Sequence, residues 1–251
     1  MRMLQRTGGF TLVELVMTIV LLGIISAVLA PVITTSVTAY TDTRSRNELI
    51  ARGRIALGRL AREIHQAVPN SLRVLAGDNT IEFVTASAGG RYVDRNDTLI
   101  SSCATARRFR TGFNLTQLCL LNPQANFAAD GDTLVIGNTS PTTLQYGSSR
   151  VTLNGDPGGG PPLWTVAFSN HTFNEASPGM HFNIVDATHE VGLVSGTDGL
   201  RWRMNNGISL GLYDNAATVS TADPLLIDGV SGITFTYNAA ADGMLNVNLR
   251  L

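Results

Sequence analysis

The sequence predicts an α+β protein in which one long N-terminal helix, first membrane-spanning and then amphipathic, packs on a mainly antiparallel β-sheet domain. Three observations predict this class. A run without any charge occupies residues 15–40, and most of its residues are apolar. A more polar stretch with helical periodicity follows over residues 41–69. From residue 70 onward, short segments rich in β-branched and aromatic residues alternate with Gly, Asn and Asp turns, and no helical pattern separates them.

Length and composition exclude several classes of function. A chain of 251 residues is long enough to bury one good-sized core. The net charge is −1, so no global field favours nucleic acid or anionic lipid as a partner. All 18 Lys+Arg residues are arginine, which excludes Schiff-base chemistry and a phosphate-loop lysine.

The first apolar segment has the length of a membrane span. Arg2 and Arg6 precede it and predict that the N-terminus stays in the cytoplasm. Residues 10–32 would span about 34 Å as a helix, more than the roughly 30 Å of a bilayer core. A secretory signal is cut after its apolar region, whereas here the small pair Gly8-Gly9 precedes it and only residues 27–30 offer a weak later site. We therefore expect the mature protein to keep this helix.

Glu14 is the only charged residue of this segment. Inserting a carboxylate at the centre of a spanning helix costs about 2.5–3.5 kcal/mol, so such residues are functional candidates. The simpler interpretation is that Glu14 lies near the cytoplasmic end and reaches the lipid headgroups. Cleavage after Gly9 would, however, create an α-amino group on Phe10, and a carboxylate on a neighbouring helix is a natural partner for that cation.

The stretch GGFTLVELVMTIVLLGII resembles the class III signal of type IV pilins and type II secretion pseudopilins. This resemblance implies a pilin-like fold with a leader peptide at 1–9, a transmembrane or filament-core helix at 10–40 and an amphipathic continuation at 41–69. It also implies that a prepilin peptidase cuts between Gly9 and Phe10, that Phe10 becomes N-methylated, and that Glu14 neutralises the Phe10 amine of an adjacent subunit. Pro31 falls where many pilins carry a proline, which would loosen or kink the helix.

The amphipathic continuation shows apolar residues at spacings of three, four and seven. They are Leu49, Ile50, Leu57, Leu60, Ile64 and Val68. Most charged residues of the stretch lie off this stripe, and Pro69-Asn70 gives a stop signal near residue 68. The sequence therefore predicts one helix from Phe10 to about Val68, packed on the sheet. A membrane-surface helix is the alternative.

A periplasmic, β-rich globular domain is predicted over residues 70–251. Strands are expected at 71–75, 80–85, 133–137, 150–153, 165–169, 181–185, 190–195, 199–204, 208–213, 233–238 and 244–251. Residues 155–162 are expected to form a flexible loop and residues 86–130 an irregular insertion. Pilins of this sort usually carry a further strand beyond the last one here, so we expect either a truncated C-terminus or an unpaired sheet edge.

Cys103 and Cys119 are the only cysteines. In an exported protein they would form one bridge, closing a loop of about 17 residues that contributes about 3 kcal/mol on the loop-entropy model. In the cytosol they would be two ordinary thiols. The pilin-like N-terminus implies export, so a Cys103–Cys119 disulfide is expected.

Other candidate sites have weak sequence support. Residues 94–97 and 130–132 gather carboxylates, but they lack the spacing of a calcium loop, and solvated turns are the better interpretation. The cluster at 107–110 holds three arginines and a phenylalanine, a pattern suited to anions or DNA but more often found in a surface loop. The histidines have no metal-site spacing and no nucleophile motif accompanies them, so we expect no enzyme, cofactor or metal.

The sequence thus predicts a minor type IV pilin or pseudopilin, a structural subunit that initiates or caps pilus assembly. Residues 177–185, 190–194 and 199–203 resemble minor pilins of the mannose-sensitive haemagglutinin (MSHA) pilus and, more distantly, J-type minor pseudopilins. Expected partners are other pilins through the N-terminal helix, the prepilin peptidase and the inner-membrane assembly platform, without nucleic acid. The expected location is the bacterial inner membrane, single-pass with the domain in the periplasm, and then the pilus or pseudopilus. Alternatives are an adhesive or DNA-binding tip module, a type II secretion pseudopilus component, and a periplasmic enzyme on an uncleaved anchor.

Overall fold

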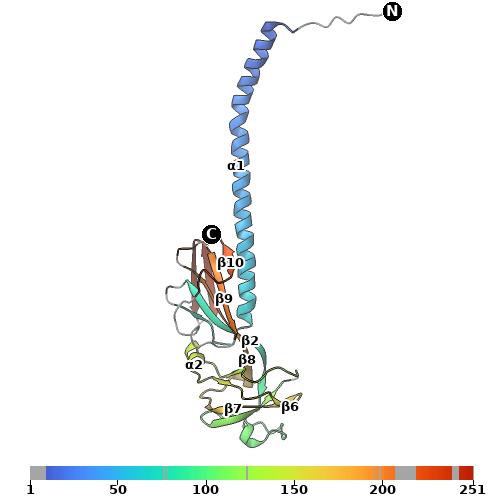
Figure 1. Ribbon diagram of the computed structural model, residues 1–251, viewed down its shortest axis with the longest axis vertical. Helices are drawn as coiled ribbons and strands as arrows, with labels where there is room; N and C mark the ends of the chain where they lie inside the picture. Colours follow the sequence, from blue (N-terminus) through green and yellow to red (C-terminus); the bar gives the residue numbers. More distant parts are fainter. Residues whose placement is uncertain are drawn as a thin grey trace, which may run out of the picture. The chain divides into compact units, whose positions relative to one another are not determined.

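The computed structural model describes residues 10–75, 77, 79–122, 124–194, 196–197, 199–206, 219–238 and 243–250. The chain divides into two compact units, Met1–Arg52 and Gly53–Leu251, and each is described by itself. A long apolar helix is followed by a mainly antiparallel β-sheet, which confirms the predicted fold class (Figure 1). The second unit begins inside the stretch 41–69 that the sequence assigns to the amphipathic part of the helix.

The helix, α1, runs over Leu12–His65 and continues through Pro31. It ends three residues earlier than predicted, because the chain after it joins the sheet. Ala67 forms an isolated bridge with Thr85, and the amide of Val68 donates to the carbonyl of Val84. A residue that pairs with a strand cannot keep helical geometry, so this pairing sets the end of α1.

The strands form a ten-stranded sheet and a separate hairpin. The ten are β1 (Arg73–Val74), β2 (Thr80–Tyr92), β3 (Asn114–Leu121), β4 (Thr133–Ile136), β5 (Arg150–Thr152), β6 (Gly158–Gly160), β7 (Leu163–Thr172), β8 (His181–Leu193), β9 (Gly199–Asn206) and β10 (Leu225–Asp228). Their order is β10-β9-β8-β2-β3-β7-β6, with β1 on β2, β4 on β8 and β5 on β4, and each of these pairs is antiparallel. The hairpin pairs β11 (Gly232–Asn238) with β12 (Met244–Arg250). Three short helical elements, η1 (Thr105–Arg107), α2 (Pro141–Gln145) and η2 (Pro178–Met180), interrupt the connections.

Strand β8 organises the sheet, and the sequence divided it wrongly into 181–185 and 190–195. The structure shows one strand, which pairs with β2 along most of its length, with β4 near its start and with β9 near its end. The polar residues Asp186, Thr188 and His189 interrupt the apolar pattern that marks a strand. Thr188 and His189 are tolerated because they have cross-strand partners on both sides, and Asp186 because its side chain is exposed. The predicted strand at 208–213 lies outside the described residues.

The expectation of an irregular insertion at 86–130 is wrong in two places. β2 continues to Tyr92 through alanines and glycines, which are weak strand formers. At Gly90 a Cβ atom would lie 2.5 Å from the carbonyl oxygen of Leu121 and 2.8 Å from the ring of Phe182, so the close packing there requires glycine. β3 was missed as well. Its leucines and polar residues neither alternate strictly nor form one continuous apolar run, which are the two patterns that indicate a strand. The segment at 158–160, expected in a flexible loop, pairs with β7 as β6.

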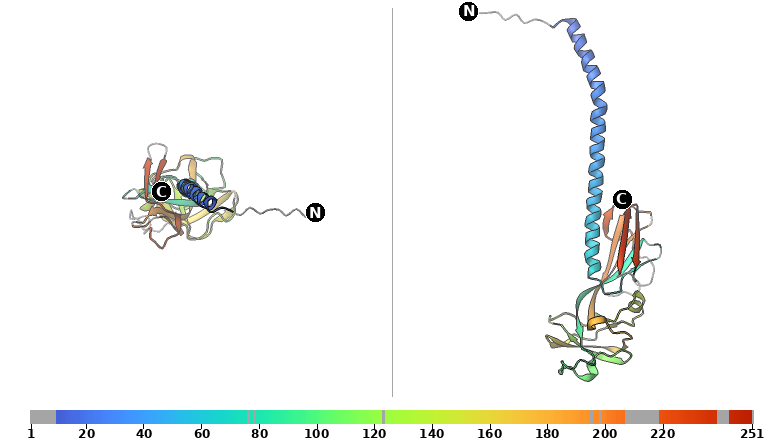
Figure 2. Two further views of the ribbon diagram at one scale, coloured as in Figure 1. Left: turned by 90° about the horizontal axis from the view of Figure 1, so that it is seen from above. Right: turned by 180° about the vertical axis from the view of Figure 1, so that it is seen from behind.

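Two main apolar clusters fill the second unit. One gathers aromatic residues from β2, β7, β8 and the loops, including Phe173 and Phe182, and leucines from β3. The other packs Ala56 and Leu60 of α1 against Phe83, Trp202 and Phe235 of the strands. Figure 2 shows the red strands of the hairpin beside the cyan part of α1.

The predicted apolar stripe of α1 is partly wrong. Leu60 is buried, and Leu57 and Ile64 are half-buried, but Ile50 is exposed. The missed members are Gly53 and Ala56, both buried. Small residues escape a search for large apolar side chains, although they allow the closest approach of a helix to a sheet.

Candidate processing and assembly site

The start of α1 is set by Thr11, a residue that the sequence reasoning did not single out. The amide of Glu14 donates to Thr11 Oγ1 at 3.3 Å, and the amide of Leu15 donates to the Thr11 carbonyl at 3.1 Å. This is the N-cap arrangement, which satisfies donors that the first helical turn leaves free. The signal was present as the spacing Thr-x-x-Glu, which is typical of a capping box.

The backbone and the side chain of Glu14 have different surroundings. Its backbone amide completes the cap, while its side chain is exposed on the first turn of the helix. Phe10 precedes the helix with 69% of its surface exposed. Gly9 and the other residues of the predicted leader lie outside the described residues. The structure thus places Phe10 and Glu14 at the same end of α1, with the carboxylate open to a second molecule.

The apolar residues that follow Glu14 are exposed in the chain taken alone. From Leu15 to Val37 each large one has about half or more of its surface exposed. α1 is long and apolar enough to cross a membrane by length and composition. A surface of this size on one helix marks contact with lipid or with other helices.

Pro31 lies inside this exposed part of α1. It has no N–H to donate to the carbonyl of Ala27, so one helical hydrogen bond is missing. On its other side, Thr34 and Thr35 donate their hydroxyls to the Pro31 carbonyl at 3.0 and 2.7 Å. These bonds satisfy both hydroxyls inside the helix, which lowers the cost of placing them in an apolar environment.

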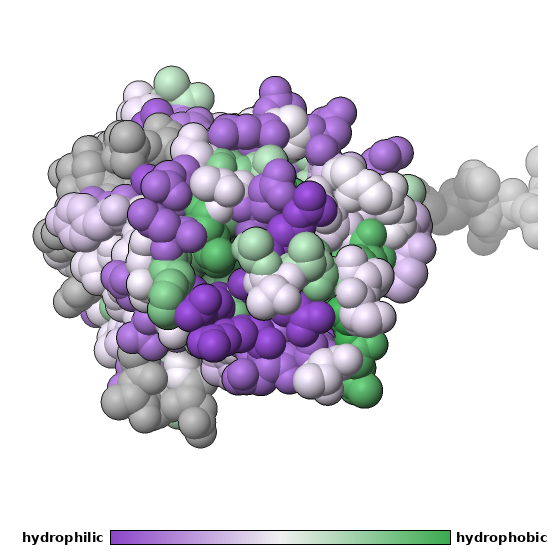
Figure 3. Space-filling view, turned by 90° about the horizontal axis from the view of Figure 1, so that it is seen from below, coloured by the Kyte–Doolittle hydropathy of each residue, from purple (hydrophilic) through white to green (hydrophobic). Residues whose placement is uncertain are grey.

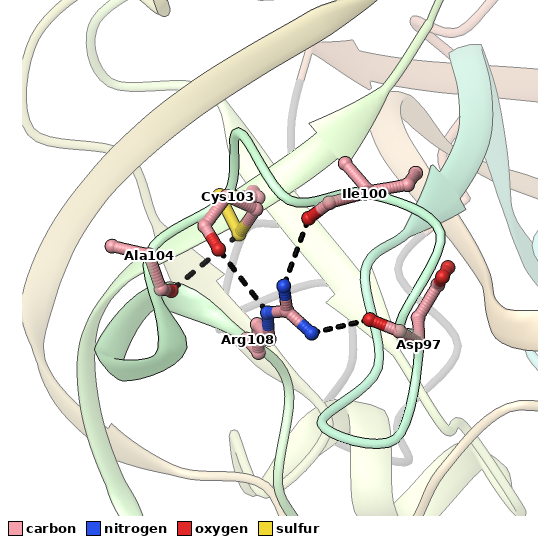
Figure 4. The surroundings of a disulfide bond; sticks show 6 residues. Asp97, Ile100, Cys103, Ala104 and Arg108 are labelled. Atoms are coloured by element: carbon pink, nitrogen blue, oxygen red, sulfur yellow. Dashed lines mark hydrogen bonds between the residues drawn. A yellow bond between two sulfur atoms is a disulfide. The ribbon is translucent and has the colours of Figure 1, made fainter.

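Cys103 and Cys119 form a disulfide in the second unit, and both are almost fully buried. Arg108 lies beside it (Figure 4). Its guanidinium donates to the carbonyls of Cys103 at 3.2 Å and Ile100 at 2.8 Å, and also to the carbonyl of Asp97. The Cys103–Cys119 disulfide and the Arg108 guanidinium therefore both hold the loop that contains Asp97, Ile100 and Cys103.

The cluster at 107–110 does not form an arginine patch for anions. Arg108 is committed to backbone carbonyls, and Phe109 is buried. The guanidinium of Arg110 lies 3.6 Å from the ring centroid of Phe113, which is a cation–π contact. Of the three arginines only Arg107 remains exposed. Figure 3 shows one face of the protein, on which hydrophilic and hydrophobic residues are interspersed.

The carboxylates proposed for calcium serve as turn acceptors. Asp94 and Asp97 accept from the amides of Asn96 and Leu99, two residues ahead, at 2.9 and 3.0 Å. Asp132 accepts from Ala129 at 2.7 Å and Asp130 from Gly155 at 2.6 Å. Among the described residues, no group of three or more His, Cys, Asp or Glu is placed to hold a metal ion.

His189 is built into the core of the second unit, with 4% of its surface exposed. It stacks on Phe83 with ring centroids 5.0 Å apart. Its Nδ1 accepts from the indole N–H of Trp202 at 2.9 Å, so the proton lies on Nε2, which donates to Thr85 Oγ1 at 3.0 Å. Both ring nitrogens are therefore satisfied by the neutral form.

Burial is the main cause that lowers the pKa of His189, because the cationic form would lose its hydration. Glu63 and Asp186 oppose this shift, and Arg59 adds to it. Arg59 also lies over the ring of Trp202, 4.9 Å from its centroid. The polar face of α1 formed by Arg59 and Glu63 thus meets the sheet at His189 and Trp202.

A row of four charged residues crosses the sheet on the face opposite His189, and it was not foreseen. The registers Arg73↔Glu82, Glu82↔Glu190 and Glu190↔Arg203 place them side by side on β1, β2, β8 and β9. Glu82 and Glu190 are fully buried. Arg73 Nε donates to Glu82 Oε2 at 2.7 Å, and the amide of Val219 donates to Glu190 Oε1 at 3.1 Å. The two acids are flanked by two arginines, so the row is neutral as a whole.

Comparison with known proteins gives one match. Residues 4–30 match the prokaryotic N-terminal methylation motif. No curated protein and no solved structure matches the chain. The match covers residues 4–9, Phe10, Glu14 and the first part of the exposed apolar helix. The chain thus carries a type IV pilin-like prepilin signal, followed by a long apolar helix and a mainly antiparallel β-sheet.

Proposed function

We propose that the chain is a minor type IV pilin or pseudopilin, a structural subunit in the initiation or tip complex of a pilus. The match of residues 4–30 to the N-terminal methylation motif carries this proposal. The exposed apolar surface of α1 supports it, because a mature subunit would bury that surface first in the inner membrane and then among the helices of a filament. The sheet domain would lie in the periplasm.

The residues at the start of α1 take specific roles in this proposal. A prepilin peptidase cuts between Gly9 and Phe10, and the new amine of Phe10 is methylated. Glu14 accepts the Phe10 amine of an adjacent subunit, which fixes the axial register of the two helices. The exposed carboxylate of Glu14 and the exposed Phe10 support this pairing. Pro31 weakens the helix locally, so that neighbouring helices can adjust their packing.

The partners follow from the same roles. They are other pilins through α1, the prepilin peptidase and the inner-membrane assembly platform. The likeness of the β8 and β9 region to MSHA-pilus minor pilins favours that filament, with a type II secretion pseudopilus as the alternative. A DNA-binding tip loses support, because Arg108 and Arg110 are engaged within the chain.

Mass spectrometry of the mature N-terminus tests the processing step. We expect a chain that begins at methylated Phe10. Recovery of the chain with residues 1–9 attached, from cells that trim their other pilins, would overturn the proposal.

A pair of variants tests the role of Glu14. Glu14→Ala is expected to be inserted and processed but largely absent from purified filaments. Glu48→Ala is the matched control, because it removes an exposed carboxylate from the same helix, one that pairs with Arg52 at 2.6 Å in a surface salt bridge worth little. Equal incorporation of the two variants would contradict the proposed register contact.

A further inference from the structure

Strand β12 has an open edge. On one side it pairs with β11 from Gly232↔Arg250 to Asn238↔Met244. On the other side, no described strand pairs with it. An edge strand of this kind presents a row of backbone N–H and C=O groups to any extended chain that approaches it.

A groove follows this edge inside the second unit. A cavity of about 460 Å³ lies between Leu57 and Ala61 of α1 and Leu245 and Val247 of β12. A second hollow of about 680 Å³ also includes Leu57 and Val247 and reaches Asn246 on the outer face of the hairpin. The volume of the first lies within the range of ligand pockets, roughly 300–1,000 Å³. The groove therefore has room for side chains placed beside β12.

The alternation along β12 determines what such side chains should be. Leu245, Val247 and Leu249 are half-buried and pack on the cluster that contains Leu60, whereas the residues between them are exposed. Side chains of a neighbouring strand alternate in step with those of β12. A strand added to this edge would thus direct every second side chain into the groove, and these positions should be apolar.

On the described parts of α1 and β12 that form the groove, the exposed charges are of one sign. On α1 from Gly53 to His65 and on β12, the exposed charged side chains are all arginines. Arg54 lies one turn before Leu57, Arg62 follows Ala61, and Arg250 lies near the end of β12. Glu63, the acidic residue of this part of α1, is half-buried, and its charge interacts with His189 instead. A partner segment with acidic residues at its ends would complement this rim.

We propose that the groove between α1 and β12 is a strand-addition site for an extended, acidic segment of a partner protein, with apolar residues at alternate positions. Backbone hydrogen bonds to the β12 edge provide affinity, the groove at Leu57 and Ala61 takes the apolar side chains, and the arginines select acidic ends. The site lies in the globular unit, so it does not depend on processing of the N-terminus.

Peptide binding to the full chain in lipid nanodiscs tests this site. The probe is a fluorescent peptide of about nine residues, with valine at alternate positions and glutamate at both ends. Its companions carry lysine at the ends or proline at the centre. We expect the glutamate peptide to bind, the lysine peptide to bind about tenfold more weakly or worse, and the proline peptide to lose binding. Hydrogen exchange of the amides at 244–250 should slow when the glutamate peptide is bound.

Two variants localise the binding. Ala61→Glu places a carboxylate in the groove at an exposed position and should weaken binding about tenfold or more. Ile55→Glu makes the same change of charge on α1 at a residue that is 74% exposed and does not line the groove, and it should bind like the parent. Tryptophan fluorescence confirms that both variants fold. Equal binding of the glutamate and lysine peptides, unchanged exchange at 244–250 or an equal loss in the two variants would overturn the proposal.

Discussion

Removing the disulfide should weaken the globular unit by an amount that the loop length sets. Cys103 and Cys119 are separated by 16 positions, so the bond closes a loop of about 17 residues. On the loop-entropy model this removes about 10 cal/mol/K from the unfolded chain, or about 3 kcal/mol at room temperature. We therefore expect the variant with both cysteines changed to alanine to lose about 3 kcal/mol in its free energy of unfolding.

The two tryptophans allow this loss to be located. Trp164 lies opposite Leu120, the residue after Cys119, and Trp202 lies in the cluster formed with α1. Urea unfolding of the full chain in nanodiscs is followed by tryptophan fluorescence. The Trp202→Phe background leaves Trp164 as the probe, and the Trp164→Phe background leaves Trp202. Each disulfide-free variant is compared with its own parent. The Trp164 transition should shift by the full amount, and an equal shift at Trp202 would show that the clusters unfold together.

Chemical reduction of the parent chain provides the control. It breaks the same bond without changing either residue, so it should lower stability by a similar amount. A loss below about 1 kcal/mol at Trp164, in both the reduced and the substituted chain, would refute the loop-entropy argument. It would mean that the unfolded chain gains less entropy on losing the bond than the model assigns to a loop of about 17 residues.

Three further predictions concern the core, the pH response and the loop. Leu60→Ala should cost about 2–5 kcal/mol in urea unfolding, against less than about 0.5 for Ile55→Ala, and similar costs would contradict the packing of α1 on the sheet. Because burial lowers the pKa of His189, the unfolded chain binds the proton more readily, and stability should fall as the pH drops below about 6.5. His189→Gln should reduce this fall, and an unchanged pH profile would exclude His189 as its cause. Arg108→Ala should speed hydrogen exchange at 97–103 whereas Arg107→Ala should not, and equal rates would contradict the contacts in Figure 4.

The N-terminal part of the fold could be predicted from sequence because local chemistry determines it. Thr11, Glu14 and the uncharged run act within one helix, and the pattern of residues is enough to define it. The sheet was harder where residues depend on distant partners. Gly90 belongs to a strand because Phe182 packs across it, and nothing near Gly90 in the sequence reveals that contact.

The same limit applies to the functional residues. The cluster at 107–110 looks like a binding surface in sequence, but Arg108 turns to carbonyls that lie five to eleven positions away. Burial of Gly53 and Ala56 depends on how closely α1 approaches the strands, which apolar spacing alone does not report. Similarly, the β12 groove arises from residues nearly two hundred positions apart.

The charged row of Arg73, Glu82, Glu190 and Arg203 has a consequence for how the strands find each other during folding. Side chains alternate between the two faces, so a slip of β2 by one residue would move Glu82 into the cluster of Leu60, Trp202 and Phe235, and would place Phe83 on the face that holds the buried charges. Glu82 would then lose the donor Arg73 Nε, which lies 2.7 Å from its Oε2, and breaking a buried ion pair costs about 3–5 kcal/mol. A one-residue slip is therefore unfavourable in free energy on both faces of the sheet, and the four charged residues favour the observed strand register.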